Sequence, residues 1–581
     1  MQKTITIYIL LLLGVSSFSL SGSFIFRQTP CLYLSLAGSF LLAIVAIVGM
    51  FKKQFFSLTS SEIVLILLLL VVALHAVYIE RITPLWFLSF VSLLVLYMLV
   101  RRVNLQQDWL IGGIIMMGLV QAMYGIGQYF RWFPNVASNY PVSGSFDNPA
   151  GFAASLVILF PVALVLVSRA SIYLRIVGVT AALILFVSIV LSESRAGFLA
   201  LLFVLAYWLY HTIKIKFLAR LSKCIKISIT SVLIVAILVG LYFIKKDSAD
   251  GRLLIWQITA QMIADKPLSG HGVGGFKKDY MLYQASFLKE HPDNKSTPLA
   301  DIVRHPFNEL LLLMVEHGVP GILFVSLFVF LVVKTHRQTK NDTSIYAVYS
   351  LIGLMVFAMF SYPLNFPFIR LTMVLSFAII MQNEKRLIIL PNRLTPAIKL
   401  SSLLVCVILL GASAKLFYDD YQWNIIAKRS LRGETLQVLP DYARLYKTMN
   451  QNDLFLYNYG AELNYIGEWE QSNIVLCECA LIYNDNDLQL LFADNYQRLH
   501  QYRQAEECLL LAYQMIPNRF IPLYRLVKLY ELQGKDKQAL MLARSILEKP
   551  IKINSVEILS IRTEMEQLIE KINFKAISTK G

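Results

Sequence analysis

Thirteen runs of roughly 17–25 mostly apolar residues dominate this 581-residue sequence. Such a run lets an α-helix cross the hydrocarbon layer of a membrane, where a helix satisfies its own backbone hydrogen bonds. Charged residues make up only 15% of the chain, against about 25% in soluble domains. We therefore predict an all-α polytopic membrane helical bundle of about 13 spans. The expected spans are 4–20, 32–51, 62–79, 84–100, 109–127, 150–167, 176–192, 197–212, 227–244, 309–333, 344–361, 367–382 and 400–417.

Lysine and arginine are distributed unevenly among the loops between these spans. One set of loops holds basic clusters, including Arg101-Arg102 and the segment 214–226, whereas the short loops of the other set together hold only four single arginines. Because basic loops stay in the cytoplasm, the N-terminus is predicted to be cytoplasmic, with 245–308 a long outer loop and the C-terminal region periplasmic. A cleaved signal peptide remains an alternative for the first span and leaves the other orientations unchanged. The single arginines are Arg27, Arg81, Arg131 and Arg195.

The formal net charge of +16 belongs to the apolar part of the chain. Residues 419–581 contain 19 Lys and Arg against 21 Asp and Glu, a net charge of −2, so the other residues carry +18. No basic stripe of the kind that binds nucleic acid is visible on a soluble segment. We therefore predict a membrane domain, residues 1–418, followed by an outer domain, residues 419–581, and no nucleic-acid partner.

The outer domain repeats itself with a period close to 34 residues. The segments that begin at Gly467, Gln501 and Gly534 match one another. This spacing resembles tetratricopeptide repeats, which are paired helices that stack to bury their apolar faces. Docking of a protein partner and a purely structural role both remain open for these repeats.

Several polar residues lie where the spans meet the outer surface. An ionisable residue near a span is costly, so its default interpretation is functional. Arg195 lies in a tight turn between two spans, and Arg370 follows Pro367 at the start of another. For both, a local ion pair or snorkelling to the interface is the structural alternative. The glycines after Ser269 formally contain a G-x-G-x-x-G motif, but without a βαβ unit they do not predict a dinucleotide site.

The long loop ends in a polar block that leads into the next span. Pro306 fits the first position of a helix, which would make His305 the capping residue at the mouth of that span. In a regular helix Glu309 and Glu316 would then lie near the same face as His305. Because imidazole titrates near neutrality, His305 beside Asn308 is a candidate catalytic group.

These motifs together resemble the O-antigen ligase and polymerase superfamily of bacterial envelope glycosyltransferases, which includes protein O-oligosaccharyltransferases. The similarity covers roughly residues 110–380, and the motifs occur in the order typical of the superfamily. The thirteenth span and the repeats depart from the minimal ligase plan. The matching segments are 144–153, 194–197, 251–256, 265–272 and 305–321.

The resemblance implies transfer of a glycan from a polyprenyl-diphosphate carrier to an acceptor hydroxyl at the outer face of the bacterial inner membrane. Arg195 and Arg252 would hold the diphosphate, since a guanidinium fork binds phosphate oxygens. His305 would accept the proton of the hydroxyl. The resemblance also implies inversion at the anomeric carbon, without metal or cofactor. The remaining candidate substrate-binding residues are Arg304, Asn308, Glu316, Gln128, Asp147, Asn148 and Arg370.

Other functions remain open at this point. A polymerase would use the same chemistry to extend a glycan on its carrier. A polysaccharide or lipid transporter also has many spans, although its polar residues tend to lie at the bilayer midplane. A non-catalytic scaffold that recruits envelope proteins is a third interpretation. The identities of the glycan and of the acceptor (lipid A–core, protein or another carrier) are not predicted.

Overall fold

The computed structural model of the chain divides into two compact units. The first, here the bundle unit, comprises Met1–Ile244 and Phe307–Asn424, and the second, here the hairpin unit, comprises Lys245–Pro306 and Ile425–Gly581. The expected span 227–244 and the basic segment 214–226 lie outside the described residues. The structure describes residues 2–17, 29–49, 57–78, 84–135, 140–212, 246–292, 294–338, 342–389, 395–552 and 554–578.

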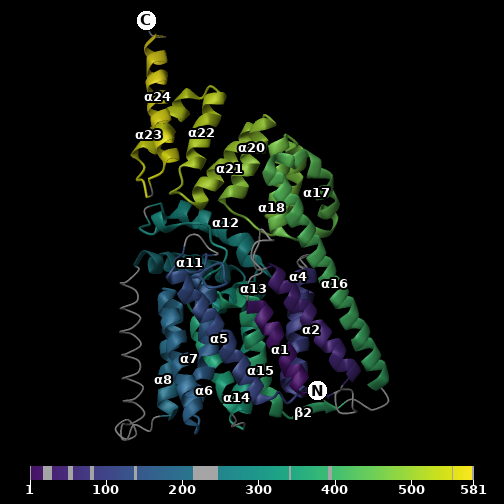
Figure 1. Cartoon of the computed structure of the whole chain (residues 1–581). Coiled ribbons are helices and arrows are strands. Elements are labelled where there is room, and N and C mark those ends of the chain that lie inside the picture. The colour runs from purple at the N-terminus through teal and green to yellow at the C-terminus, as the bar shows by residue number, and fades with distance from the viewer. Residues whose placement is uncertain are drawn as a thin grey trace. The chain divides into compact units, whose positions relative to one another are not determined.

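The bundle unit is built almost entirely from apolar helices (Figure 1). In the described part of the chain, nine helices are long and apolar enough to cross a membrane, and three shorter apolar helices accompany them. This confirms an all-α polytopic membrane protein. The helices are α1 (Gln2–Ser17), α2 (Thr29–Gly49), α3 (Ser60–Tyr78), α4 (Pro84–Arg102), α5 (Gln107–Tyr129), α6 (Pro149–Val167), α7 (Ile172–Leu191), α8 (Arg195–Thr212), α13 (Glu309–His336), α14 (Asp342–Ala358), α15 (Pro367–Ile380) and α16 (Thr395–Arg429).

Helix α6 forms the centre of the bundle unit. Its residues from Gly151 to Leu166 are all buried, because the sequence is apolar on every face. It contacts α5, α7, α8, α14 and α15. Gly178 of α7 allows one of these contacts, since a Cβ there would lie 2.8 Å from the carbonyl oxygen of Ala163. The C-terminal part of α6 is therefore packed tightly against α7.

Helix α13 is interrupted near its first third. Gly318 has φ 58° and ψ −157°, and Pro320 follows it inside the same helix. Glycine tolerates this backbone conformation, and proline lacks the N–H that would continue the hydrogen-bond ladder. The expected uninterrupted span 309–333 is thus two helical segments joined at a kink.

A buried network of ion pairs lies at the end of the bundle unit where α3 begins and α4 ends. Glu62 is fully buried and accepts hydrogen bonds from Arg101 Nη2 at 3.0 Å and Arg102 Nη2 at 3.1 Å. Ser61 Oγ donates to Glu384 Oε2 at 2.5 Å. Beside this network the strands β1 (Ser57–Thr59) and β2 (Arg386–Ile389) pair antiparallel. The network therefore ties α3 and α4 to the segment that follows α15.

The hairpin unit combines the long loop with the C-terminal helices. From the loop come α11 (Lys246–Asp265), α12 (Gly275–Glu290) and the short η1 (Thr297–Leu299), and α12 packs on α21. The boundary between the two compact units falls between Asn424 and Ile425, inside α16. The boundary predicted from the sequence lies between residues 418 and 419. The C-terminal elements are η5 (Ser430–Glu434), α17 (Thr435–Met449), α18 (Asp453–Ile466), α19 (Trp469–Ala480), α20 (Asn486–Arg498), α21 (Tyr502–Met515), α22 (Ile521–Leu532), α23 (Asp536–Glu548) and α24 (Val556–Ser578).

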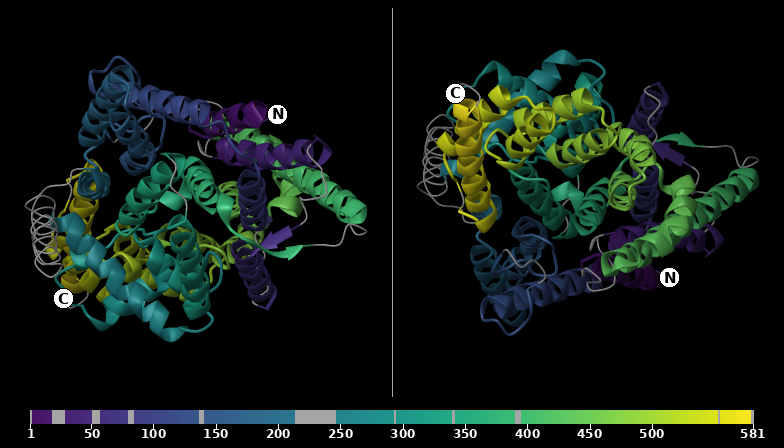
Figure 2. Two further views of the ribbon diagram at one scale, coloured as in Figure 1. Left: turned by 90° about the horizontal axis from the view of Figure 1, so that it is seen from below. Right: turned by 90° about the horizontal axis from the view of Figure 1, so that it is seen from above.

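The C-terminal helices form successive antiparallel pairs that follow one another in chain order (Figures 1 and 2). The turns inside three pairs each contain a left-handed residue, namely Gly467, His500 and Gly534. These residues lie 33 and 34 residues apart, in step with the period of the sequence repeat. The pairs are α18 with α19, α20 with α21, and α22 with α23. Their identity as tetratricopeptide repeats stays a prediction.

Candidate functional site

The start of α13 differs from the sequence prediction. The helix begins at Glu309, and its capping residue is Asn308, whose Oδ1 accepts hydrogen bonds from the backbone N–H groups of Leu310 (2.9 Å) and Leu311 (3.1 Å). The prediction that Pro306 starts the helix and that His305 caps it is therefore wrong. An asparagine side chain satisfies these N–H groups well. His305 consequently does not share a helix face with Glu309 and Glu316.

Three helices of the bundle unit begin around one short turn. The turn η2 (Pro363–Asn365) contacts α6 and α15, and the backbone N–H of Leu364 donates to Glu309 Oε1 at 2.9 Å. Tyr362 lies between them, with its hydroxyl 3.5 Å from Asn148 Nδ2 and its ring 5.4 Å from that of Phe307. The N-termini of α6, α13 and α15 thus converge. Helix N-termini carry partial positive charge and favour anions.

Two predicted arginines lie at helix starts in the same unit. Arg195 is the first residue of α8, and Gly197 packs so closely on α6 that a Cβ would lie 2.8 Å from Ala153 Cβ. Arg370 lies in the first turn of α15, where it interacts electrostatically with Glu309. Both guanidinium groups are partly buried. They add positive charge to the end of the unit at which α6, α8, α13 and α15 begin.

The side chains of Gln128 and Asn148 are engaged by the backbone. Gln128 is 4% exposed, and its Oε1 accepts hydrogen bonds from the N–H groups of Ser143 (3.1 Å) and Gly144 (2.7 Å). Asn148 caps α6 by accepting from Gly151 N at 2.9 Å, and its Nδ2 donates to the exposed Asp147 at 2.9 Å. In this structure Gln128 and Asn148 shape the loop before α6, and Asp147 presents its carboxylate to solvent.

In the hairpin unit, one face of α11 meets the segment that carries His305. Trp256 Nε1 donates to the carbonyl oxygen of Pro306 at 2.8 Å. Arg252 precedes Trp256 by one helical turn, and residues four apart in a helix are neighbours on its surface. Arg252 therefore lies on the same face of α11 as Trp256, and its proximity to His305 stays a prediction.

Arg304, the residue before His305, is held in place by hydrogen bonds to the C-terminal part of the chain. The Nε and Nη2 atoms of Arg304 donate to Tyr483 Oη at 3.2 and 2.9 Å, and the guanidinium lies 4.7 Å from the ring centroid of Tyr483. Tyr483 in turn donates to Asp485. Lys277 of α12 forms an ion pair with Asp453. These contacts fasten the end of the loop to the first helix pairs.

This environment strongly affects His305. Burial, together with the positive charges of Lys277 and Arg304, lowers the pKa of His305 to about 4. Both effects disfavour the imidazolium ion. At neutral pH the ring is therefore uncharged, and an uncharged imidazole has a ring nitrogen that can accept a proton.

The structure thus distributes the predicted residues over two groups. Gln128, Asp147, Asn148, Arg195 and Arg370 belong to the bundle unit, as do Asn308, which caps α13, and Glu316 within that helix. Arg252, Arg304 and His305 belong to the hairpin unit. Sequence reasoning missed Trp256, Tyr362, Lys277 and Tyr483. Trp256 could have been found from the sequence, because it lies four residues after Arg252 and therefore on the same helix face.

Within the described ranges, no group of three or more His, Cys, Asp or Glu residues is arranged to hold a metal ion. The polar atoms of both groups are instead guanidinium, imidazole, amide, hydroxyl and isolated carboxylate groups. Chemically, the positive groups of the bundle unit can attract an anion, and the uncharged His305 of the hairpin unit can accept a proton.

Fold and site together define a polytopic membrane protein in which arginines and helix N-termini gather at one end of the bundle unit and a buried, uncharged histidine lies in the hairpin unit. Residues 180–326 match a protein family described as O-antigen ligase. A stretch of 100 residues, 17% of this chain, is 33% identical to a Rickettsia conorii protein named "Putative polysaccharide ligase", and 122 residues, 21% of this chain, are 30% identical to a Rickettsia felis protein of that name. These matches confirm the similarity to the O-antigen ligase-like superfamily.

The matched stretches cover 22% and 29% of those two relatives, so the chain spans about a quarter of the length of the curated relatives it matches. The family match includes Arg195, Arg252, Arg304, His305, Asn308 and Glu316, and it leaves out Gln128, Asp147, Asn148 and Arg370.

Proposed function

We propose that this protein transfers an oligo- or polysaccharide from a polyprenyl-diphosphate carrier to an acceptor hydroxyl at the outer face of the bacterial inner membrane. The observation that carries the proposal is His305, an imidazole held uncharged between Lys277 and Arg304 within the segment that matches O-antigen ligases. A glycosyl transfer to an alcohol needs such a base.

The donor is a lipid with a compact, strongly negative headgroup. Arg195 and Arg252 hold its diphosphate as bidentate donors, and Arg370 and the N-termini of α6, α13 and α15 add positive potential. Charge grows on the diphosphate as it departs, and fixed positive groups stabilise this charge in the transition state. The proposed step therefore needs no bound metal ion, and transfer is expected to persist in EDTA.

In the reaction, the acceptor oxygen attacks the anomeric carbon while the bond from that carbon to the diphosphate oxygen breaks. The hydroxyl proton goes to a ring nitrogen of His305, and the bonding electrons leave with the diphosphate. Direct displacement of this kind inverts the anomeric centre. Asp147, Asn148, Asn308 and Glu316 are the proposed contacts to the sugar or the acceptor.

The test is the variant His305→Ala in reconstituted membranes supplied with a polyprenyl-diphosphate-linked oligosaccharide and an envelope fraction. We expect transfer to fall at least about a hundredfold, as measured by mass spectrometry of released polyprenyl diphosphate. His291→Ala on the same loop is the matched control, because His291 is exposed and its ring Nδ1 lies 3.0 Å from the carbonyl oxygen of Phe287 in the preceding helix turn. Normal transfer by His305→Ala would remove the proposed base.

The acceptor decides between ligase and polymerase. The description of the matching family and the name of the Rickettsia conorii relative both refer to ligases, which favours attachment of a finished chain. Gel profiles of surface glycan in a deletion strain separate the outcomes. Loss of all attached chains supports a ligase, whereas loss of only the long chains would contradict it and indicate a polymerase.

A further inference from the structure

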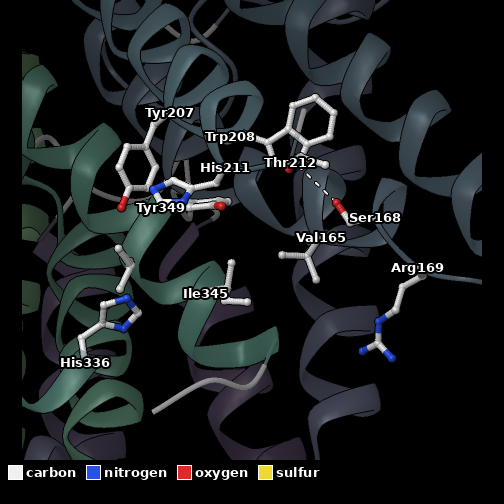
Figure 3. Close-up of a pocket in the computed structure, with 11 residues that line it drawn as sticks. Val165, Ser168, Arg169, Tyr207, Trp208, His211, Thr212, His336, Ile345 and Tyr349 are labelled. Carbon is white, nitrogen blue, oxygen red and sulfur yellow. Dashed lines mark hydrogen bonds between the residues drawn. The ribbon is translucent and has the colours of Figure 1, made fainter. Parts of the chain in front are cut away.

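A pocket of about 410 Å³ lies in the bundle unit, and none of its lining residues has a role in the proposed transfer (Figure 3). A volume of this size lies within the range of small-molecule sites. Its walls come from the C-terminal ends of α6, α8 and α13 and from the first turns of α14. The lining residues are Val165, Ser168, Arg169, Tyr207, Trp208, His211, Thr212, His336, Ile345, Val348 and Tyr349.

Within the bundle unit, this pocket lies at the opposite end of α6 from Asn148. The 19 residues of α6 extend about 28 Å between Asn148, which caps the start of the helix, and Ser168, which lines the pocket. Such a length matches the hydrocarbon thickness of a membrane. On the predicted topology, the pocket opens at the cytoplasmic surface, where the proposed transfer does not use it.

Aromatic rings gather on one side of the pocket. The ring of Tyr207 lies 5.3 Å from that of Tyr349 and 4.5 Å from that of His211. Figure 3 shows these rings around the same space as His336. Aromatic faces attract organic cations. Helices α6 and α13 also end here, with Ser168 and Arg337 as their C-terminal caps, and helix C-termini carry partial negative charge.

Groups that suit a phosphate lie on the other side. Arg169 follows the end of α6 and lines this side of the pocket, and Trp208 Nε1 donates a hydrogen bond to Ser168 Oγ at 3.3 Å. Arginine is the side chain best matched to phosphate oxygens. Val165, Ile345 and Val348 supply an apolar wall, and none of the eleven lining residues is acidic.

We propose that this pocket binds the headgroup of a phospholipid that carries both a phosphate and an ammonium group. Arg169 and the neighbouring hydroxyls bind the phosphate, and the rings of Tyr207 and Tyr349 receive the ammonium at the helix C-termini. The acyl chains leave along the apolar wall into the membrane. A purely anionic lipid fits less well, because its second polar group would face aromatic rings and carbonyl ends.

The experiment is native mass spectrometry of the full-length protein in detergent, with phosphatidylethanolamine, phosphatidylglycerol or inorganic phosphate added separately. We expect phosphatidylethanolamine to bind most tightly and inorganic phosphate to bind weakly. Arg169→Gln should weaken binding of phosphatidylethanolamine about tenfold, which corresponds to one charge-assisted hydrogen bond. Tyr207→Leu should weaken it about threefold, and Tyr207→Phe should change it less than about twofold, since Phe keeps the ring.

Arg337→Gln is the matched control, because it removes the same charge from the exposed residue that follows the lining residue His336. It should bind phosphatidylethanolamine like the unchanged protein. Unaltered binding by Arg169→Gln would overturn the proposal. Equal binding of phosphatidylglycerol would overturn the ammonium assignment, and equal binding of inorganic phosphate would overturn a lipid site. All variants are first compared with the unchanged protein by thermal unfolding.

Discussion

The surroundings of His305 predict a specific dependence of transfer on pH. Its pKa lies at about 4, below the ordinary 6.5, because the ring is buried and lies near Lys277 and Arg304. This displacement corresponds to roughly 3 kcal/mol of discrimination against the imidazolium ion. The proposed base must be uncharged to act. The value of kcat/KM should therefore stay constant on acidification from neutral pH and fall only near pH 4.

Substitution of Lys277 should raise the pH at which kcat/KM begins to fall. Lys277→Gln removes one positive charge and also leaves the carboxylate of Asp453 without its ammonium partner. Both changes stabilise protonated His305 and raise its pKa. At an effective dielectric constant of about 20, with screening by salt, one charge within about 10 Å is worth about 0.5–1 pKa unit. The acid limb should then lie between about pH 4.5 and 5.

The assay measures release of polyprenyl diphosphate in proteoliposomes at several donor concentrations between about pH 3.5 and 8. In the proposed mechanism the bound diphosphate adds negative charge beside the ring, so the acid limb of kcat should lie at higher pH than that of kcat/KM. Lys278→Gln serves as the control, since Lys278 neighbours Asp279 at 3.7 Å and does not contribute to the pKa shift of His305. An acid limb that stays in place in Lys277→Gln, or that moves equally in both variants, would refute the reasoning.

Three further substitutions test other parts of the structure. Arg195→Lys should lower kcat/KM about 10–100-fold, because an ammonium group cannot replace the guanidinium fork on a diphosphate. Tyr483→Phe removes the hydroxyl that accepts two hydrogen bonds from Arg304, and kcat should fall about tenfold with the donor KM unchanged. Glu62→Gln leaves buried Arg101 without its charged partner, so thermal unfolding should show a loss of about 3–5 kcal/mol.

Matched controls separate these effects from general damage. Arg131→Lys and Tyr465→Phe change exposed residues of the same types and should retain full transfer. Glu470→Gln should leave thermal unfolding unchanged, because Glu470 is exposed. Wild-type kinetics in Arg195→Lys or Tyr483→Phe would contradict the role assigned to that residue. An unfolding temperature equal to that of the unchanged protein in Glu62→Gln would show that the buried network adds no stability.

The amino-acid sequence by itself determined the spans and the candidate chemistry. A membrane span is a local property, because one helix satisfies its own backbone and its hydropathy can be read from about 20 consecutive residues. Each expected span in the described ranges is a helix of the structure. The helix-turn spacing of the C-terminal region was likewise visible, since Gly467 and Gly534 recur in the turns.

Only the tertiary structure decided which polar groups meet. Asn308 rather than His305 caps α13, because the chain before that helix is held by Trp256 and cannot start the helix at Pro306. Tyr483 lies 179 residues from Arg304, and Leu364 lies 55 residues from Glu309. Such partners are chosen by the packing of whole helices. A hydrogen bond needs atoms within about 3 Å, and no periodicity along the chain specifies a distance between segments so far apart.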